Sequence, residues 1–75
     1  MRSYQIKLCS VEEVKEFVNI VSQYGYEIKL QRDHYKVDAK SIMGVLSLGL
    51  NTPLTLIADT DNAVSLQNEL NHLLV

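Results

Sequence analysis

The sequence predicts an α+β fold in which helices cover one side of an antiparallel sheet, and two patterns in the chain point to it. Four short segments alternate apolar and polar residues, which is typical of strands with one buried face. Three other segments repeat apolar residues at helical spacing, which is typical of helices with one buried stripe. These segments follow one another as βαββαβα, and the chain length of 75 residues predicts a single domain over residues 1–75.

The first strand and helix are marked by a change of period. Tyr4, Ile6 and Leu8 alternate with polar residues, which indicates a half-buried strand. Ser10 is a good N-cap for the following helix, and Glu13, three residues later, makes the pair a capping box. The apolar stripe of this helix is formed by Val11, Val14, Phe17, Val18, Val21 and Tyr24.

A hairpin is expected after this helix. Gly25 is expected to end the helix, and alternation from Tyr26 to Gln31 predicts the second strand. Asp33-His34 predicts a tight turn. Tyr35 and Val37 are expected to face inward on a short third strand.

The second half of the chain repeats this alternation of helix and strand. Ser41 predicts the N-cap of a short apolar helix, Ile42–Leu48, and Gly49 is its expected C′ residue. The inner face of the fourth strand is formed by Leu54, Leu56 and Ala58. Asp59–Asp61 are expected to supply caps and early acidic residues for the last helix. The apolar stripe of that helix is formed by Ala63, Leu66, Leu70 and Leu73.

The composition argues against several classes of function. The formal net charge is −2, which gives no electrostatic case for binding nucleic acid. Cys9 is the one cysteine, so an internal disulfide is excluded and a zinc site is not expected. We expect Cys9 to be a buried small side chain rather than a nucleophile. The chain has neither a signal-peptide pattern nor an apolar run long enough to cross a bilayer, so we expect a cytoplasmic protein without membrane insertion.

The most distinctive motif is Val37-Asp38-Ala39-Lys40-Ser41-Ile42-Met43-Gly44-Val45-Leu46-Ser47-Leu48-Gly49. It resembles the HPr family, the histidine-containing phosphocarriers of the bacterial phosphoenolpyruvate-dependent sugar phosphotransferase system. That family has a valine, two variable residues and then Lys-Ser-Ile-Met-Gly-Val-Met-Ser-Leu-Gly, so Leu46 for methionine is the sole departure. The resemblance covers nearly the whole chain. It implies an open-faced β-sandwich of four antiparallel strands with three helices on one face.

The phosphohistidine motif of the family is missing from this chain. The family has Gly-Leu/Ile-His-Ala-Arg-Pro-Ala between the first strand and the first helix. In its place stand Cys9, Ser10, Glu12 and Glu13, with no histidine, arginine or proline. The two glutamates add negative charge where the phosphoryl group of a family member would sit. The resemblance therefore implies no catalytic residue in this loop.

The two histidines of the chain lie elsewhere. His34 falls in the turn between the second and third strands, and His72 falls near the end of the last helix. Neither has an arginine–proline neighbourhood or a helix start. We expect both to be solvated surface residues.

Two sets of residues in the matching motif have a structural and a functional interpretation. Ser41 is either an N-cap alone or also the serine that a dedicated kinase phosphorylates in many HPr proteins. Ile42, Met43 and Leu46 either pack in the core or form a docking surface, and we expect Met43 and Leu46 to be exposed enough to contact a partner.

The leading functional hypothesis is an HPr-like protein related to the sugar phosphotransferase system that carries no phosphate on histidine. Such a protein would be a regulatory or binding module, switched by phosphorylation of Ser41. It would need no cofactor and would not be an enzyme. The resemblance suggests HPr kinase, a catabolite repressor or phosphotransferase components as partners of a monomer or weak homodimer. The alternatives are a working phosphocarrier and a phosphorylation-independent interaction domain.

Overall fold

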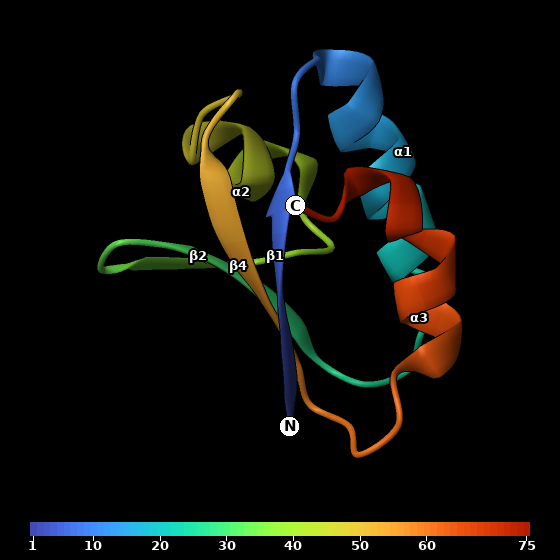
Figure 1. Cartoon of the computed structure of the whole chain (residues 1–75). Helices are drawn as coiled ribbons and strands as arrows, with labels where there is room; N and C mark the ends of the chain where they lie inside the picture. The colour runs from blue at the N-terminus through green and yellow to red at the C-terminus, as the bar shows by residue number, and fades with distance from the viewer.

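The computed structural model describes all of residues 1–75 and confirms the βαββαβα order (Figure 1). The elements in chain order are β1 (Arg2–Lys7), α1 (Val11–Val21), β2 (Ile28–Arg32), β3 (Tyr35–Asp38), α2 (Ile42–Ser47), β4 (Pro53–Ala58), α3 (Val64–Glu69) and a 3₁₀ turn, η1 (Asn71–Leu73).

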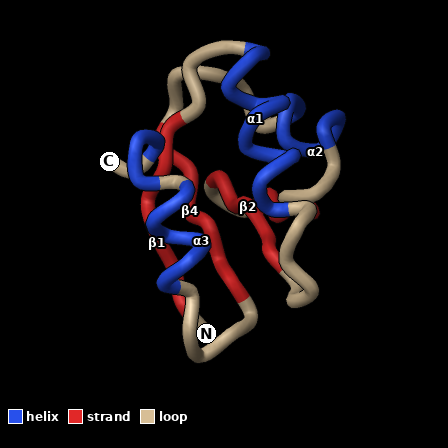
Figure 2. Tube along the Cα trace, turned by 90° about the vertical axis from the view of Figure 1, so that its right-hand side faces the viewer, coloured by secondary structure: helices blue, strands red, loops and turns tan.

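The four strands form one antiparallel sheet in the order β1-β4-β2-β3. The register aligns Leu56 of β4 with Tyr4 of β1 on one side and with Leu30 of β2 on the other. Because side chains alternate along each strand, this register places the apolar residues of neighbouring strands on one face. The three helices cover that face (Figure 2), which confirms the predicted layering.

The core between the sheet and the helices is entirely apolar. Its 18 buried residues are all hydrophobic, and no polar or charged residue is buried. Phe17 of α1 is the largest fully buried side chain. Leu54, Leu56 and Ala58 of β4 are all buried, as the alternation of that strand predicts. The chain therefore uses the hydrophobic effect without any buried polar network.

Both capped helices begin where the sequence predicts. The Ser10 hydroxyl accepts a hydrogen bond from the Glu13 amide at 3.1 Å, and α1 begins at the next residue, Val11. Ser41 caps α2 in the same way through the Gly44 amide at 3.2 Å. Gly49 follows α2 with a φ of 91°, a conformation that favours glycine.

Several details of the helices differ from the sequence expectations. Val11, expected in the apolar stripe of α1, is 42% exposed, whereas Val14 of that stripe is fully buried. The helix ends at Val21, earlier than Gly25, and Tyr24 packs against the core from the loop that follows. The N-cap of α3 is Ala63, which provides no side-chain cap, so residues 59–61 do not cap this helix; Asn62, one residue earlier, accepts from the Val64 amide through its side-chain oxygen at 3.2 Å.

The expectation that Tyr35 faces inward is wrong. Its side chain is 72% exposed, whereas Val37, two residues later, is half-buried against the core. Tyr35 directly follows the two-residue turn at Asp33-His34, where the hairpin projects beyond the rest of the sheet (Figure 1). The apolar–polar alternation therefore continues past the point at which helices can cover the sheet.

The capping interaction of α1 can be tested by removing its acceptor. Ser10→Ala leaves the Glu13 amide without its partner, so we expect a loss of about 0.5–2 kcal/mol in the free energy of unfolding. Denaturant midpoints of the two proteins measure this loss. Ser65→Ala is the control, because Ser65 is exposed on α3 and a surface change of this kind stays within about 0.5 kcal/mol. Equal midpoints for the two variants would contradict the capping assignment.

Candidate functional site

The junction between β1 and α1 is held by two hydrogen bonds that both involve Glu13. In addition to the bond between Ser10 and the Glu13 amide, the Glu13 carboxylate accepts from the Cys9 amide at 2.8 Å. This is a variant of the capping box. The Glu13 carboxylate binds the amide of Cys9, which is one residue before the N-cap residue Ser10. Glu12 adds a second negative charge in the first turn. This helix start is consequently acidic, and the side-chain cap occupies the Glu13 amide of its first turn.

Cys9 is exposed, so the expectation of a buried small side chain is wrong. Alternation along β1 places Leu8 in the core, and Leu8 is 1% exposed. The next side chain must then point away from the core. Cys9 has no second cysteine to pair with.

Neither histidine lies near the start of α1. His34 is exposed in the hairpin turn. His72 is exposed in η1, where its Nε2 atom lies 2.9 Å from the Glu16 carboxylate. The structure therefore places both histidines on the surface, as expected from the sequence. No group of three or more His, Cys, Asp or Glu side chains is arranged to hold a metal ion.

Ser41 lies at the start of α2 on a half-exposed site. Its hydroxyl oxygen accepts from the Gly44 amide, while its backbone has the extended conformation of an N-cap, with φ −107° and ψ 115°. A Cβ atom at Gly44 would lie 3.4 Å from both the Ser41 hydroxyl and Val37. The small residue at position 44 thus lets the first turn of α2 pack closely against β3.

Lys40 holds the loop between α1 and β2 in place. Its ammonium donates to the Tyr24 carbonyl at 2.6 Å and to the Tyr26 carbonyl at 3.0 Å. The Tyr24 hydroxyl in turn donates to Glu69 of α3. That hydrogen bond, with burial as the second cause, raises the pKa of Tyr24 to about 12. The Lys40 ammonium, whose residue is next to Ser41 in the sequence, is therefore hydrogen-bonded to the carbonyls of the loop between α1 and β2.

The three apolar candidates on α2 differ in exposure. Met43 is 77% exposed and Ile42 is 41% exposed. Leu46 is half-buried and packs against the core. The short helix therefore presents Met43 most fully, because Val45 and Leu48 occupy its buried side.

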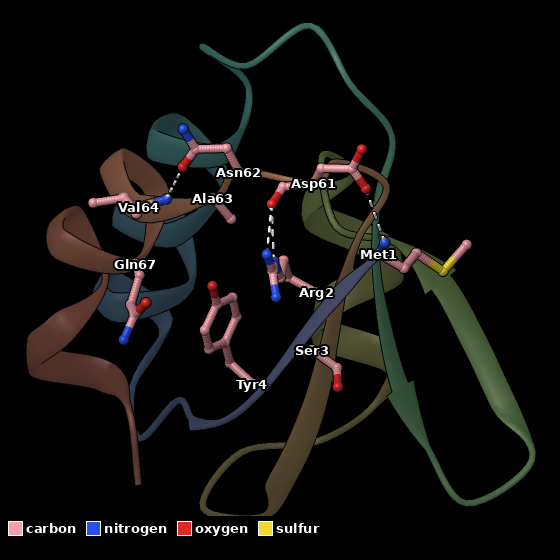
Figure 3. Close-up of a pocket in the computed structure, with 9 residues that line it drawn as sticks. All are labelled: Met1, Arg2, Ser3, Tyr4, Asp61, Asn62, Ala63, Val64 and Gln67. Atoms are coloured by element: carbon pink, nitrogen blue, oxygen red, sulfur yellow. Dashed lines mark hydrogen bonds and ion pairs between the residues drawn. The ribbon is translucent and has the colours of Figure 1, made fainter.

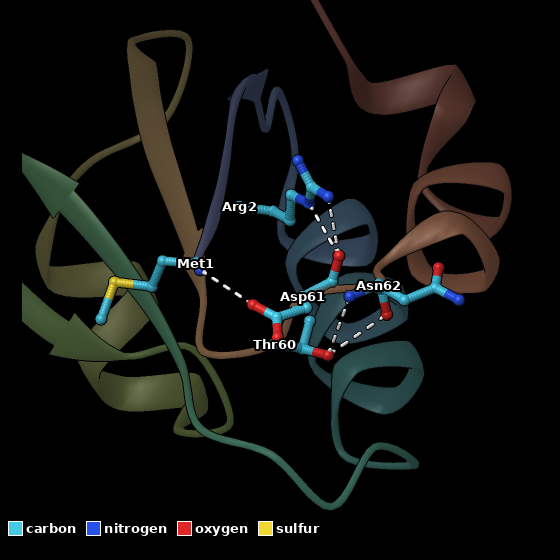
Figure 4. Close-up of polar contacts among 5 residues, drawn as sticks. All are labelled: Met1, Arg2, Thr60, Asp61 and Asn62. Carbon is cyan, nitrogen blue, oxygen red and sulfur yellow. Dashed lines mark hydrogen bonds and ion pairs between the residues drawn. The ribbon is translucent and has the colours of Figure 1, made fainter.

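One polar pocket of about 430 Å³ lies between the start of β1 and α3 (Figure 3). The Arg2 guanidinium donates to the Asp61 carbonyl at 2.8 and 3.0 Å, and the Met1 ammonium lies 3.9 Å from the Asp61 carboxylate (Figure 4). Tyr4 points into the pocket from β1, and Gln67 faces it from α3 (Figure 3). The polar contacts join the β4–α3 loop to the N-terminal strand, so their evident role is structural.

A second cavity, which the sequence patterns did not indicate, lies between the β2–β3 hairpin and the end of α2. It measures about 470 Å³ and includes Arg32, Tyr35 and Ser47 in its lining. The Arg32 guanidinium donates to the Leu48 carbonyl at 2.6 Å and so joins the hairpin to the last turn of α2. Residues 16 positions apart make this bond. Local spacing carries no signal of such a contact.

Comparison with known proteins agrees with this geometry. The model of a family described as "PTS HPr component phosphorylation site" matches residues 12–75. The match begins after Cys9 and Ser10, so β1 lies outside it. It includes α2 and the strands β2, β3 and β4. The chain is also similar to a solved structure, HPr-C-His from Thermoanaerobacter tengcongensis, with a TM-score of 0.80. The two are 28% identical over 96% of this chain and 89% of that one.

No helix in the structure has the length and apolar character required to cross a bilayer.

Three observations lead to one assignment. They are the extent of the family match, the four-stranded antiparallel sheet with three helices, and the similarity to a solved HPr structure. The chain belongs to the HPr family of the phosphotransferase system.

Proposed function

We propose that this protein is an HPr-family member that carries no phosphate on histidine and functions as a regulatory or binding module. The observation that carries the proposal is the capped start of α1, where the Ser10 hydroxyl accepts from the Glu13 amide and the Glu13 carboxylate accepts from the Cys9 amide. No histidine lies in that segment. The role is that of a protein recognised by others rather than that of a catalyst.

The electrostatics of the α1 start support this proposal. A phosphoryl group at a helix start is stabilised by unpaired amides and by nearby cations. Here the Glu13 and Cys9 amides are already hydrogen-bonded, and the nearest charges in the first turn are Glu12 and Glu13. The same carboxylates that stabilise the helix, each by about 0.3–1 kcal/mol, would repel a phosphate.

Phosphorylation of Ser41 is the proposed switch. The Ser41 hydroxyl is half-exposed, and it caps α2 by accepting from the Gly44 amide. A phosphate on this oxygen would remain at the positive end of the helix, next to the amides of its first turn. Because Lys40 is bonded to the carbonyls of Tyr24 and Tyr26, these amides rather than the lysine would provide the first contacts.

The proposed recognition surface consists of Ile42, Met43 and Leu46. Met43 offers a flexible and polarisable side chain that adapts to different partners. Ile42 adds a second exposed apolar side chain, and Leu46 contributes its accessible part. By analogy with the family, HPr kinase, a catabolite repressor and phosphotransferase components are the partners to test.

The absence of phosphocarrier activity is directly testable. Incubation with phosphoenolpyruvate and the general phosphotransferase enzyme is expected to leave the mass of the protein unchanged, because α1 begins without a histidine. Intact-mass spectrometry at neutral pH measures this, with a histidine-containing HPr as the positive control. An acid-labile gain of one phosphate, lost in a His34→Ala or His72→Ala variant, would show a working phosphocarrier.

The switch is tested by treatment with HPr kinase and phosphosite mapping. The phosphate is expected on Ser41 alone, and Ser41→Ala is expected to remain unmodified. Binding of a phospho-dependent partner should then weaken by about tenfold or more in Met43→Ala, because a phosphate alone provides charge but little shape. Circular dichroism checks that this variant is folded. Phosphate on Ser47, or full binding by Met43→Ala, would mean that the surface is misassigned.

A further inference from the structure

The two edge strands of the sheet, β1 and β3, differ in how their outer edges are covered. Along β1, the Val75 amide donates to the Gln5 carbonyl at 3.0 Å, so the segment around Leu74 pairs with part of that edge. β3 pairs with β2 alone, and the hairpin that carries it projects beyond the rest of the sheet (Figure 1). The outer edge of β3 is therefore open to a further strand.

The β2–β3 ladder shows which backbone groups of β3 point toward this open edge. The Ala39 amide donates to the Ile28 carbonyl at 3.0 Å, so the backbone of Ala39 faces β2. Because the two edges of a strand alternate in an antiparallel ladder, the backbone of Val37 also faces β2. Lys36 and Asp38 therefore direct their amides and carbonyls outward.

Lys36 and Asp38 also carry opposite charges on the uncovered face of the sheet. Val37 lies between them and packs against the core, so alternation places both charged side chains on the other face, where they are exposed. Lys36 lies opposite Gln31 of β2 and makes no ion pair within the chain. The Asp38 carboxylate is held at the edge, because its Oδ1 atom accepts from the Lys40 amide at 2.9 Å.

A second copy of the chain is complementary to this edge in one register. When two β3 strands run antiparallel about a two-fold axis at Val37, Lys36 of each copy lies opposite Asp38 of the other. Each such pair brings opposite charges together and directs the outward backbone groups of both residues at each other. The neighbouring symmetric registers place Lys36 opposite Lys36 or Asp38 opposite Asp38, which like-charge repulsion disfavours. The charges therefore select one register.

The backbone groups at this edge are almost all free for such pairing. The Asp38 carbonyl accepts from the Ser41 amide at 3.1 Å, and a carbonyl oxygen has a second lone pair for a second donor. The Lys36 amide and carbonyl and the Asp38 amide make no hydrogen bond outside the β2–β3 ladder, from which they point away. Both copies would thus gain partners for groups that water alone binds in the single chain.

Neighbouring residues favour the same register. Lys29 of β2 lies opposite Asp38 within the chain, and its ammonium also lies 4.0 Å from Glu27. In the pair of chains, the Asp38 carboxylate would lie between Lys29 of its own copy and a lysine of the other. On the helix-covered face, Tyr35 would lie opposite Ala39 of the second copy. The Tyr35 side chain is 72% exposed in the single chain, and this arrangement gives it an apolar neighbour.

We propose that the protein forms a weak homodimer in which the β3 strands of two copies pair antiparallel about Val37 and join the two sheets into one. A strand of 4 residues on each side makes a small interface, and interfaces below about 1,200 Å² are typical of weak, transient complexes. The proposal goes beyond the proposed function and needs no phosphate on Ser41. Experiments on the unmodified protein therefore test it separately.

Sedimentation equilibrium of the whole chain tests the association between about 0.02 mM and about 1 mM, and the mean mass is expected to rise toward that of a dimer. An equimolar mixture of ¹³C,¹⁵N-labelled and unlabelled chains identifies the register. We expect an isotope-filtered contact between the α protons of Val37 in the two copies, because this pair brings the Cα atoms to about 4.5 Å. The Lys36 and Asp38 amides should exchange more slowly as the concentration rises.

Two charge variants and their mixture test the complementarity. Lys36→Glu places carboxylates opposite each other and Asp38→Lys places ammonium groups opposite each other, so each is expected to raise the dimer Kd at least about tenfold. Mixing the two variants restores opposite charges at both pairs, and a heterodimer with a Kd close to that of the unchanged protein is expected. Lys7→Glu is the matched control on the uncovered face of β1, at the opposite edge of the sheet, and should leave the Kd unchanged.

A milder variant guards against loss of folding. Asp38→Lys removes the acceptor of the Lys40 amide, whereas Asp38→Asn keeps an oxygen acceptor and removes only the charge. Asp38→Asn is therefore expected to fold and to raise the dimer Kd by about threefold or more. Circular dichroism checks the folding of every variant.

Several results would overturn the proposal. A chain that remains monomeric up to about 1 mM would do so, as would equal weakening by Lys36→Glu and Lys7→Glu, which is a general charge effect. Intermolecular contacts of Val37 with Tyr35 would identify a neighbouring register, and contacts at Ile57 would identify the uncovered face as the interface. The state of Ser41 after kinase treatment bears on the proposed function alone, so either proposal can fail without the other.

Discussion

The architecture depends on one constraint, which is that the apolar face of a four-stranded sheet must be covered from one side by three short helices. The register that aligns Tyr4, Leu56 and Leu30 puts the inward residues of neighbouring strands side by side. Phe17 and its neighbours on α1 cover this face, and no polar group is buried between them. In a chain of 75 residues the core is small, so helix caps of about 1 kcal/mol are a substantial part of the stability.

This constraint explains how the fold can persist without the phosphohistidine motif. The covering of the sheet requires α1 to begin after Leu8 and to present Val14 and Phe17 inward, but it leaves open how the helix is capped. A helix start can use its amides either for a bound anion or for a side-chain cap. In this chain the Ser10 hydroxyl caps the Glu13 amide, and the Glu13 carboxylate binds the Cys9 amide just before the helix. The change alters the chemistry of the loop while the sheet and its helices remain.

Much of the fold could be predicted from local patterns. The alternation at Leu54, Leu56 and Ala58 and the serine caps at positions 10 and 41 were confirmed, because burial and capping depend on spacing within one element. Tyr35 was misplaced, since its exposure depends on how far the hairpin projects beyond the helices. Cys9 was expected inside, although the buried position is taken by Leu8.

The candidate site was less predictable than the fold. Ser41 and Met43 could be identified from the motif, and their placement at the start of α2 agrees with it. The bonds of Lys40 to Tyr24 and Tyr26 and of Arg32 to Leu48 join residues 14–16 positions apart. Such contacts arise from tertiary packing. The cavity between the β2–β3 hairpin and the end of α2 is therefore visible only in the structure.

Native-state hydrogen exchange of the amides around the start of α1 tests the central claim, that Ser10 and Glu13 cap the helix through the Glu13 and Cys9 amides. The Cys9 and Glu13 amides are hydrogen-bonded, whereas those of Val11 and Glu12 have no partner in the protein. The account predicts that Cys9 and Glu13 exchange at least about tenfold more slowly than Val11 and Glu12, relative to their intrinsic rates, which corresponds to about 1.4 kcal/mol. Equal protection at all four amides would contradict it.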